Sequence, residues 1–409
     1  MKVIVIFIIL IMSAGSTLDA DSWIQKADFS GSGKLNAVAF AINGKGYVGT
    51  GNISGEATSS DIWEYDPSLN AWAQKADIPI GRRYAVGFAI GSKGYIGTGQ
   101  TDTGYLADFW EYDAQLNLWN QRANLPGAPR IVAVGFSING KGYIGTGAKP
   151  NSGLNDFYEY DPGSDSWNTK HKFPSKRYSA VGFVVGDYGY IGTGTDGYVN
   201  FKDFWKYDPI IDTWTPIADF EGESRNNSSA FSIGSFGYVG IGDNFFINDP
   251  FSDFWKYDPA SDTWLQVSNF GGGGRTVAVS FVINDNGYVG LGESKDSIGN
   301  SLFETDLWEY DPDTLSTQSS FESEEIVAVN TYPNPTIEST IISFSLLKSS
   351  NVTFELMSLN GEKTQTLIDL FLSSGRHSIT FRRKNLENGI YLLYIKCSNQ
   401  CITKKIVLQ

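Results

Sequence analysis

One basic residue recurs at a fixed place in six successive stretches of this chain, six positions before a phenylalanine each time. Arginine grips a carboxylate or a sulfate through two parallel hydrogen bonds, so six cations gathered at one place would form an anion-binding ring. The alternative is that each cation pairs with an acidic residue of its own or a neighbouring stretch. The six candidates for ligand binding are Lys34, Arg82, Arg130, Arg177, Arg225 and Arg275.

Residue types that usually carry catalysis are scarce. Of the two histidines, only His171 lies in the repeated part of the chain, so a Ser-His-Asp triad would have to use it and a copper-radical centre lacks its imidazole ligands. We therefore expect no catalytic residue, no metal and no cofactor. Six aspartates also recur, and each is expected to cap its own turn. They are Asp61, Asp108, Asp156, Asp203, Asp253 and Asp306.

The cations and aspartates belong to a repeat of about 48 residues that runs from Trp23 to about Leu315. Each copy holds a Gly-Tyr-aliphatic-Gly-x-Gly string and then an Asp-x-Trp/Tyr-Glu/Lys-Tyr-Asp string. In every copy but the last, a lone tryptophan follows 11 residues after that first aspartate. Alternating apolar and polar residues predict four short strands per copy. Six such units that bury one another's apolar faces predict a six-bladed β-propeller.

The two ends of the repeat predict how the ring closes. In the sixth copy Thr317 stands where the tryptophan of a fourth strand is expected, whereas the chain opens with an orphan fourth strand over residues 23–27. We predict that this N-terminal strand completes the last blade. All eleven tryptophans fall at two positions of the repeat, and we expect them to pack between sheets instead of binding a ligand.

The repeat motifs resemble those of kelch-repeat propellers over about 290 residues of the chain. The resemblance rests on the Tyr-Ile-Gly end of the second strand, the Trp-Glu-Tyr-Asp-Pro of the third and the tryptophan of the fourth. The Gly-Gly doublet of that family is here Gly-Thr-Gly, or Gly-Ile-Gly and Gly-Leu-Gly in the last two copies, which indicates a divergent subfamily. If the first strand is innermost, as in that family, the six cations point towards the mouth of the central channel.

Length differences between the copies occur in only two connections, those between strands two and three and those between strands four and one. In an up-and-down sheet both connections emerge on the same side, which we call the loop face. Variation confined to the loops of a rigid scaffold is typical of a binding surface. Aromatic loop residues that could stack on a sugar or a peptide are Tyr105, Tyr198, Phe245, Phe246 and Phe303.

The start of the chain and its last 80 or so residues depart from the repeat. Lys2, the apolar run of residues 3–12 and the small residues that follow match a secretory signal over residues 1–20, the alternative being a buried N-terminal strand. Residues 316–328 are predicted to form a linker, and residues 329–409 a small immunoglobulin-like β-sandwich. The predicted strands of the sandwich are residues 340–346, 352–358, 377–382, 391–396 and 402–408.

Four motifs are spread over this tail: Tyr332-Pro333-Asn334-Pro335, Leu359-Asn360-Gly361, Asn388-Gly389-Ile390-Tyr391 and the ending Lys404-Lys405-Ile406-Val407-Leu408. Together they resemble the C-terminal sorting domain of type IX secretion cargo. The resemblance implies passage through the outer membrane of a Gram-negative cell, removal of the tail, and release or attachment at the surface. The alternative is a second binding module of the same sandwich type.

Charge separates the two parts of the chain. Residues 326–409 hold nine Lys or Arg and five Asp or Glu, whereas residues 1–325 hold 22 and 40. An acidic body repels phosphates at long range, which argues against a nucleic-acid partner. Cys397 and Cys401 could bridge in an oxidising compartment, but the body upstream contains no cysteine. We expect no transmembrane segment in the mature chain.

The sequence thus predicts an all-β protein with a six-bladed propeller over residues 21–315 and a sandwich tail. We predict a secreted or cell-surface protein of a Gram-negative bacterium that binds an extracellular glycan, peptide or protein through its loop face. Its tail would engage the type IX secretion machinery. Two alternatives remain open: a sugar-acid epimerase or mutarotase on the same face, resembling the kelch-type sialic-acid enzymes, and a purely structural adhesion protein.

Overall fold

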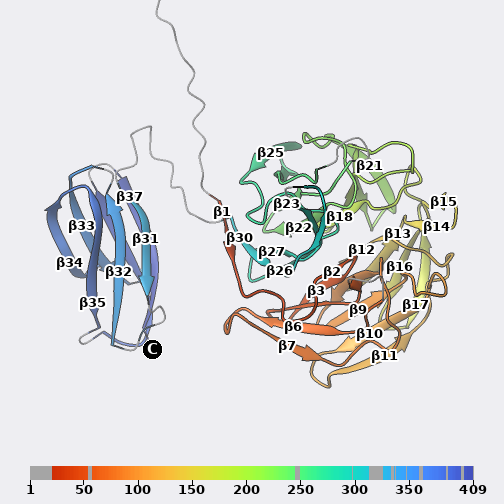
Figure 1. The fold of residues 1–409 in the computed structure, drawn as a ribbon, viewed down its shortest axis with the longest axis horizontal. Helices are drawn as coiled ribbons and strands as arrows, with labels where there is room; N and C mark the ends of the chain where they lie inside the picture. The colour runs from red at the N-terminus through yellow and green to blue at the C-terminus, as the bar shows by residue number, and fades with distance from the viewer. Residues whose placement is uncertain are drawn as a thin grey trace, which may run out of the picture. The chain divides into compact units, whose positions relative to one another are not determined.

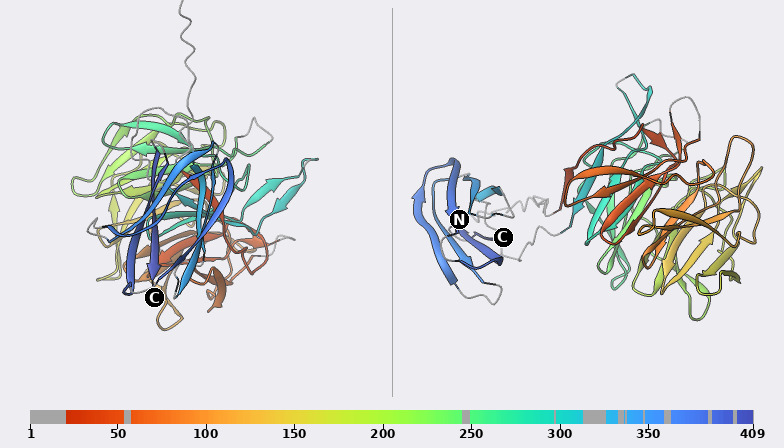
Figure 2. Two further views of the ribbon diagram at one scale, coloured as in Figure 1. Left: turned by 90° about the vertical axis from the view of Figure 1, so that its left-hand side faces the viewer. Right: turned by 90° about the horizontal axis from the view of Figure 1, so that it is seen from below.

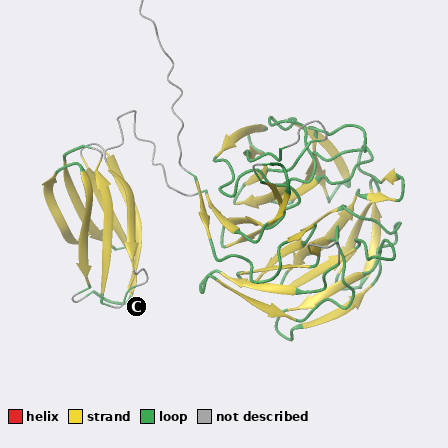
Figure 3. Ribbon diagram, in the orientation of Figure 1, coloured by secondary structure: helices red, strands yellow, loops and turns green. Residues whose placement is uncertain are grey.

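The computed structural model describes residues 21–53, 58–244, 249–296, 298–312, 326–332, 336, 338–346, 348–358, 363–383, 386–397 and 400–408. Within these ranges every regular element is a β-strand (Figure 3). No helix in this part of the chain is long and apolar enough to cross a membrane. The chain divides into two compact units, Met1–Thr314 and Leu315–Gln409.

The first unit is a six-bladed β-propeller, in which each blade is one four-stranded antiparallel sheet (Figure 1). The first strand of every blade contacts the first strands of both neighbouring blades, and the contact of β26 with β3 closes this inner circle. From the inner strand outward the blades are β3 (Val38–Ile42), β4 (Lys45–Gly49), β6 (Ile62–Asp66) and β7 (Ala71–Lys75); β8 (Val86–Ile90), β9 (Lys93–Gly97), β10 (Phe109–Asp113) and β11 (Leu118–Arg122); β12 (Val134–Ile138), β13 (Lys141–Gly145), β16 (Phe157–Asp161) and β17 (Ser166–Lys170); β18 (Val181–Val185), β19 (Tyr188–Gly192), β20 (Phe204–Asp208) and β21 (Thr213–Ile217); β22 (Ser229–Ile233), β23 (Phe236–Gly240), β24 (Phe254–Asp258) and β25 (Thr263–Val267); and β26 (Val279–Ile283), β27 (Asn286–Gly290), β30 (Leu307–Asp311) and β1 (Ser22–Gln25).

The N-terminal strand closes the ring, as predicted from the orphan strand. β1 pairs antiparallel with β30, with Trp23 opposite Tyr310 (Figure 1). Asp21, just before β1, accepts hydrogen bonds from the backbone N–H of Ser268, at 3.1 Å, and from the Tyr310 hydroxyl. The last blade is therefore assembled from both ends of the propeller.

Inward-facing rings and facing glycines explain why the blades pack so closely. The inner strands alternate in burial, so that Val86, Phe88 and Ile90 of β8 are buried while the residues between them are less so. A Cβ atom at Gly94 would lie 2.2 Å from Cε2 of Phe40 in the preceding blade. The glycine that opens the Gly-Tyr string thus leaves space for an aromatic ring from the neighbouring blade, a close approach that only glycine permits.

The tryptophans join neighbouring blades. Each fourth-strand indole Nε1 donates a hydrogen bond to a backbone carbonyl of the preceding blade or of the connection that leads from it. All eleven tryptophans pack in or against the apolar clusters between blades, which confirms their packing role. The inter-blade bonds are Trp72 to Ala27 at 3.0 Å, Trp119 to Ala76 at 2.9 Å, Trp167 to Ala123 at 2.8 Å, Trp214 to His171 at 3.1 Å, Trp264 to Ala218 at 3.1 Å and Trp23 to Ser268 at 3.1 Å.

Short extra strands occur in the connections between the second and third strands, and one, β2, occurs in the connection from β1 to β3. β2 (Lys34–Leu35) pairs with β5 (Asn52–Ile53), β14 (Ala148–Lys149) with β15 (Ser152–Gly153), and β28 (Glu293–Lys295) with β29 (Ser301–Phe303). The hairpin of β28 and β29 projects from the propeller as the cyan strands in Figure 2. It belongs to the longest of these connections.

The second unit is a two-sheet β-sandwich. One sheet has the order β31-β32-β35 and the other the order β34-β33-β36-β37, around a core that includes Phe344, Phe354 and Leu393. Two strands were not predicted, β34 and β31, and β31 begins inside the segment predicted to be a linker. The strands are β31 (Ile326–Tyr332), β32 (Ser339–Leu346), β33 (Ser350–Met357), β34 (Lys363–Leu372), β35 (Gly375–Arg382), β36 (Gly389–Cys397) and β37 (Gln400–Leu408).

Candidate functional site

The six repeated cations are buried, with at most 1% of each residue exposed. Each is paired with the aspartate that precedes the third strand of its own blade. The nitrogen–oxygen distances in the arginine pairs are between 2.6 and 2.7 Å. The pairs are Lys34–Asp61, Arg82–Asp108, Arg130–Asp156, Arg177–Asp203, Arg225–Asp253 and Arg275–Asp306.

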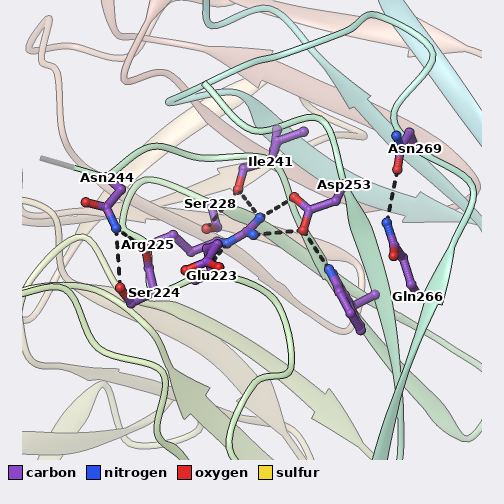
Figure 4. Close-up of polar contacts among 10 residues, drawn as sticks. Glu223, Ser224, Arg225, Ser228, Ile241, Asn244, Asp253, Gln266 and Asn269 are labelled. Carbon is purple, nitrogen blue, oxygen red and sulfur yellow. Dashed lines mark hydrogen bonds and ion pairs between the residues drawn. The ribbon is translucent and has the colours of Figure 1, made fainter. Parts of the chain in front are cut away.

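Arg225 shows how completely such a side chain is occupied (Figure 4). Its Nη1 donates to Asp253 Oδ1 at 2.7 Å and to the Ile241 carbonyl at 3.0 Å, and its Nη2 donates to Asp253 Oδ2 at 2.8 Å. Its Nε donates to the Glu223 carbonyl at 2.9 Å. The guanidinium also lies over the ring of Phe251, 4.1 Å from its centroid. The charge is therefore enclosed by the blade that carries it.

This geometry agrees with the second interpretation of the six cations, in which each pairs within its own blade. Direct ligand binding by these side chains stays a prediction. The expectation that each aspartate caps its own turn is wrong: Asp253, for example, accepts from Arg225 and also from the indole Nε1 of Trp255 at 2.7 Å. A carboxylate next to a buried guanidinium is more strongly bound than a turn cap.

The aspartates of these pairs are expected to make stability depend on pH. Burial alone would raise the pKa of Asp156, but hydrogen bonds and the charge of Arg130 outweigh burial, and the pKa is lowered. The same direction holds for Asp253 beside Arg225. A depressed folded-state pKa contributes stability that is present above the unfolded pKa of about 3.9 and is lost as pH falls through the folded value.

We therefore expect the melting temperature of the propeller to be steady above pH 5 and to fall steeply below about pH 4. Scanning calorimetry of the full chain between pH 3 and pH 7 measures this. The double variant Arg130→Met with Asp156→Leu should lose less on acidification than the parent chain. An equally steep loss in both proteins would contradict a contribution from this pair.

The connections between strands two and three lie beside those between strands four and one, as predicted. The Gly51 N–H donates to the Arg82 carbonyl at 2.7 Å, and the Arg82 N–H donates to the Ser59 carbonyl at 3.1 Å. Gly51 and Ser59 belong to the first kind of connection and Arg82 to the second. Both kinds therefore share the loop face.

Six residues encircle the mouth of the central channel on the loop face, and we call them the mouth ring. Each stands two positions after a cation and has a left-handed backbone, with φ between 47° and 58°. Most donate their backbone N–H to the carbonyl of the ring residue in the preceding blade; the Val132 to Tyr84 bond is 3.0 Å. The mouth ring consists of Asn36, Tyr84, Val132, Ser179, Asn227 and Val277.

The mouth ring surrounds an open hollow of about 130 Å³. The six residues that follow the ring residues complete its lining, and five of them are alanine while the other is Ser228. No charged side chain lines the hollow. Its polar side chains are two amides and three hydroxyls, which belong to Asn36, Asn227, Tyr84, Ser179 and Ser228.

A polar cluster behind the mouth ring was not predicted from the sequence. Asp243 Oδ2 accepts from the Thr276 hydroxyl at 2.9 Å, and Asp243 Oδ1 accepts from Asn227 Nδ2 at 3.3 Å. Burial raises the pKa of Asp243, although these hydrogen bonds oppose the shift. Sequence patterns could not reveal this cluster, because its members come from three connections and stand at positions whose residue type changes from blade to blade, with Leu35 and Ala148 among the equivalents.

Beyond the ring, the loop face carries exposed apolar side chains. Tyr198 is 85% exposed in the fourth blade, and Ile298 is 82% exposed at the tip of the hairpin formed by β28 and β29. Of the other aromatic candidates, Tyr105 and Phe303 are partly buried. Phe245 and Phe246 lie outside the described residues.

No three His, Cys, Asp or Glu residues in the described part of the chain are placed to hold a metal ion. His171 is exposed, and its backbone N–H donates to Asp212 Oδ1 at 3.0 Å. Its carbonyl accepts the indole of Trp214, so the backbone of this histidine belongs to an inter-blade contact.

Comparison with known proteins clarifies both units. Residues 330–409 match the family described as secretion system C-terminal sorting domain. The second unit is a type IX secretion sorting domain. This domain marks the chain for export, so that the protein is secreted or held at the cell surface. No curated protein matches the chain in sequence.

The propeller has a counterpart among solved structures. A structure titled "Structure of YjhT" superposes with a TM-score of 0.57 and 16% sequence identity, covering 69% of this chain and 96% of that one. Likeness at this identity establishes the propeller fold only, because one fold hosts many functions. The protein is therefore a β-propeller that carries a C-terminal sorting domain for export.

Proposed function

We propose that the propeller is a binding module that acts outside a Gram-negative cell and recognises an extracellular glycan, peptide or protein through its loop face. The observation that carries this proposal is the contrast between the repeated residues inside the blades and the variable connections on the loop face. The charges that recur in all six blades are buried in pairs within the blades, as Arg225 with Asp253 is. The length differences between blades lie in the loop-face connections, and these connections carry the exposed Tyr198 and Ile298.

The contrast supports binding because a loop face is free to vary on a rigid ring. The exposed ring of Tyr198 offers a partner an aromatic surface on which a sugar or a peptide side chain can stack. The enzyme alternative, epimerisation or mutarotation of a sugar acid, would use a cation to hold the carboxylate of the substrate while a ring carbon reacts. The arginines of the blades are poorly placed for that role, since each is buried and its guanidinium is paired with an aspartate of its own blade.

Replacing the exposed ring of Tyr198 tests the proposal. Interface aromatics commonly contribute 1–2 kcal/mol or more, so Tyr198→Ser should weaken binding of the full chain to its partner by about tenfold. Glycan arrays, peptide arrays and purified envelope polysaccharide supply the candidate partners, and biolayer interferometry measures the affinity.

Ile210→Ser is the matched control, because Ile210 is also 85% exposed but lies in the turn between strands three and four on the opposite face. We expect it to leave the affinity unchanged. If Ile210→Ser weakened binding and Tyr198→Ser did not, the loop face would not be the binding surface. If the unmodified chain converted a sugar acid, the protein would be an enzyme and the proposal of a binding role alone would be wrong.

A further inference from the structure

We infer that the hollow at the mouth ring binds one uncharged, hydroxyl-rich sugar unit, the end of a neutral glycan. This inference rests on the proposed function and narrows its ligand from three classes to one. It follows from the side chains that line the hollow, from the groups that hold them, and from the backbone edges below them.

The lining selects against charged ligands. Its five polar side chains are amides and hydroxyls, which both donate and accept hydrogen bonds as sugar hydroxyls do. The nearby repeated cations are buried and face aspartates of their own blades, so they offer no free charge to a carboxylate or sulfate. A ligand charge buried here without a partner would cost several kcal/mol, whereas a hydroxyl finds partners on every side.

Two amides of the mouth ring are fixed in orientation by residues behind them. Asn36 Nδ2 donates to Asn52 Oδ1 at 3.1 Å, and Asn227 Nδ2 donates to Asp243 Oδ1 at 3.3 Å. In both cases a residue of the connection between strands two and three takes up the amide nitrogen. The carbonyl oxygen is then the group that each asparagine presents to a ligand, and it accepts a hydrogen bond from a hydroxyl.

The backbone below the ring supplies donors as well as acceptors. In β3 and β4, Ile42 and Lys45 flank a two-residue turn whose residues Asn43 and Gly44 both have positive φ, so Ile42 and Lys45 form a hydrogen-bonded pair. Alternation along the ladder then turns the N–H and C=O groups of Ala39 and Ala41 away from β4, towards the channel. The inner strands of the other blades have the same register.

Size and shape favour a single ring. The hollow has a volume of about 130 Å³ and is open on the loop face, so one sugar ring can enter it and keep its outer edge in solvent. Tyr84, in the second blade, is the one aromatic residue of the lining, and its ring can stack on the C–H side of a sugar. Asn227 lies in the fifth blade, three places round a ring of six, so the stacking face and the amide approach a ligand from opposite sides.

The test uses the full chain and two glycine variants, Asn36→Gly and Asn227→Gly. Glycine accepts a positive φ without strain, so these variants remove the amide and keep the backbone. Isothermal titration with methyl glycosides of glucose, galactose, mannose and N-acetylglucosamine measures binding, with glucuronic acid and N-acetylneuraminic acid as charged probes. We expect at least one neutral glycoside to bind and each variant to weaken it about tenfold.

Asn139→Gly is the matched control, because Asn139 also has a left-handed backbone, with φ of 49°, but lies in the turn between strands one and two at the other end of the channel. It should leave binding unchanged. The inference fails if only the charged probes bind, if no neutral glycoside binds, or if both mouth variants bind as the parent does. Should a peptide or protein partner instead be lost in Tyr198→Ser, the proposed function survives and the sugar inference does not.

Discussion

Deletion of residues 21–30 is expected to abolish the cooperative thermal unfolding of the propeller or to lower its melting temperature by more than ten degrees. The deletion removes β1, which fills the fourth-strand place in the last blade, and the indole of Trp23. The milder variant Trp23→Ala should already lower the free energy of unfolding by about 3–5 kcal/mol, since it empties a site between aromatic rings. Those rings include Phe254 and Phe270, with centroids 5.1 and 5.0 Å from that of Trp23.

Scanning calorimetry of the full chain and the variants measures this effect. Deletion of residues 326–409 is the control, because the strands of the sandwich belong to sheets of their own and none pairs with a described propeller strand. The propeller transition should keep its temperature in that variant. A melting temperature that is unchanged on deletion of residues 21–30 would contradict closure by the N-terminal strand.

The second large effect is expected from breaking one buried ion pair. Arg130→Met should lower the free energy of unfolding by about 3–5 kcal/mol, because Asp156 is then left without its counter-charge. Arg130 is fully buried, and its Nη1 and Nη2 lie 2.6 Å from the two carboxylate oxygens of Asp156. Adding Asp156→Leu should restore much of the lost free energy of unfolding, since the methionine–leucine pair leaves no buried charge without a partner.

Denaturant unfolding of the two single variants and the double variant gives the coupling free energy of this pair. Independent, additive losses would mean that the pair does not act as a unit. The same double variant also tests the anion-ring hypothesis. Weaker ligand binding by a stable double variant would support ligand binding by Arg130, whereas full affinity would leave it with a structural role.

The repeat made most of the propeller predictable. The spacing of the Gly-Tyr and Trp-Glu-Tyr strings locates the second and third strands, and the missing tryptophan at Thr317 points to the N-terminal strand as its replacement. Because six copies carry equivalent residues, a strand whose pattern is ambiguous in one copy can be assigned from the others. A single copy would not allow this. The sandwich offers no such repetition, and β34 (Lys363–Leu372) was not predicted because charged and polar residues at its start interrupt the alternation.

The direction of the six cations could not be read from spacing. The interval from cation to aspartate is 26 residues for Arg82 and Asp108 but 31 for Arg275 and Asp306, because a connection of variable length lies between them. A search for a motif of fixed spacing therefore does not reveal that the cation and the aspartate form a pair. One signal was available: six cations and six aspartates occur once per copy, and equal numbers of opposite charges in a repeat favour pairing.

The mouth ring could not be predicted from the sequence either. Val132 and Val277 adopt a left-handed backbone, with φ of 47° and 49°, that β-branched residues rarely take. The strain is offset by the hydrogen bonds that link neighbouring ring residues, such as that from the Val277 N–H to the Asn227 carbonyl at 3.2 Å. Such a ring exists only when six blades meet, and no local pattern encodes it.

Hydrogen–deuterium exchange of the full chain with and without its ligand tests most directly whether the loop face is the binding surface. Amides in the connections between strands two and three and between strands four and one should become protected, with Tyr198 and the mouth ring inside the protected region. Amides in the turns between strands one and two and between strands three and four, such as those around Ile210, should exchange as before. Protection of these turns with no change on the loop face would contradict the account.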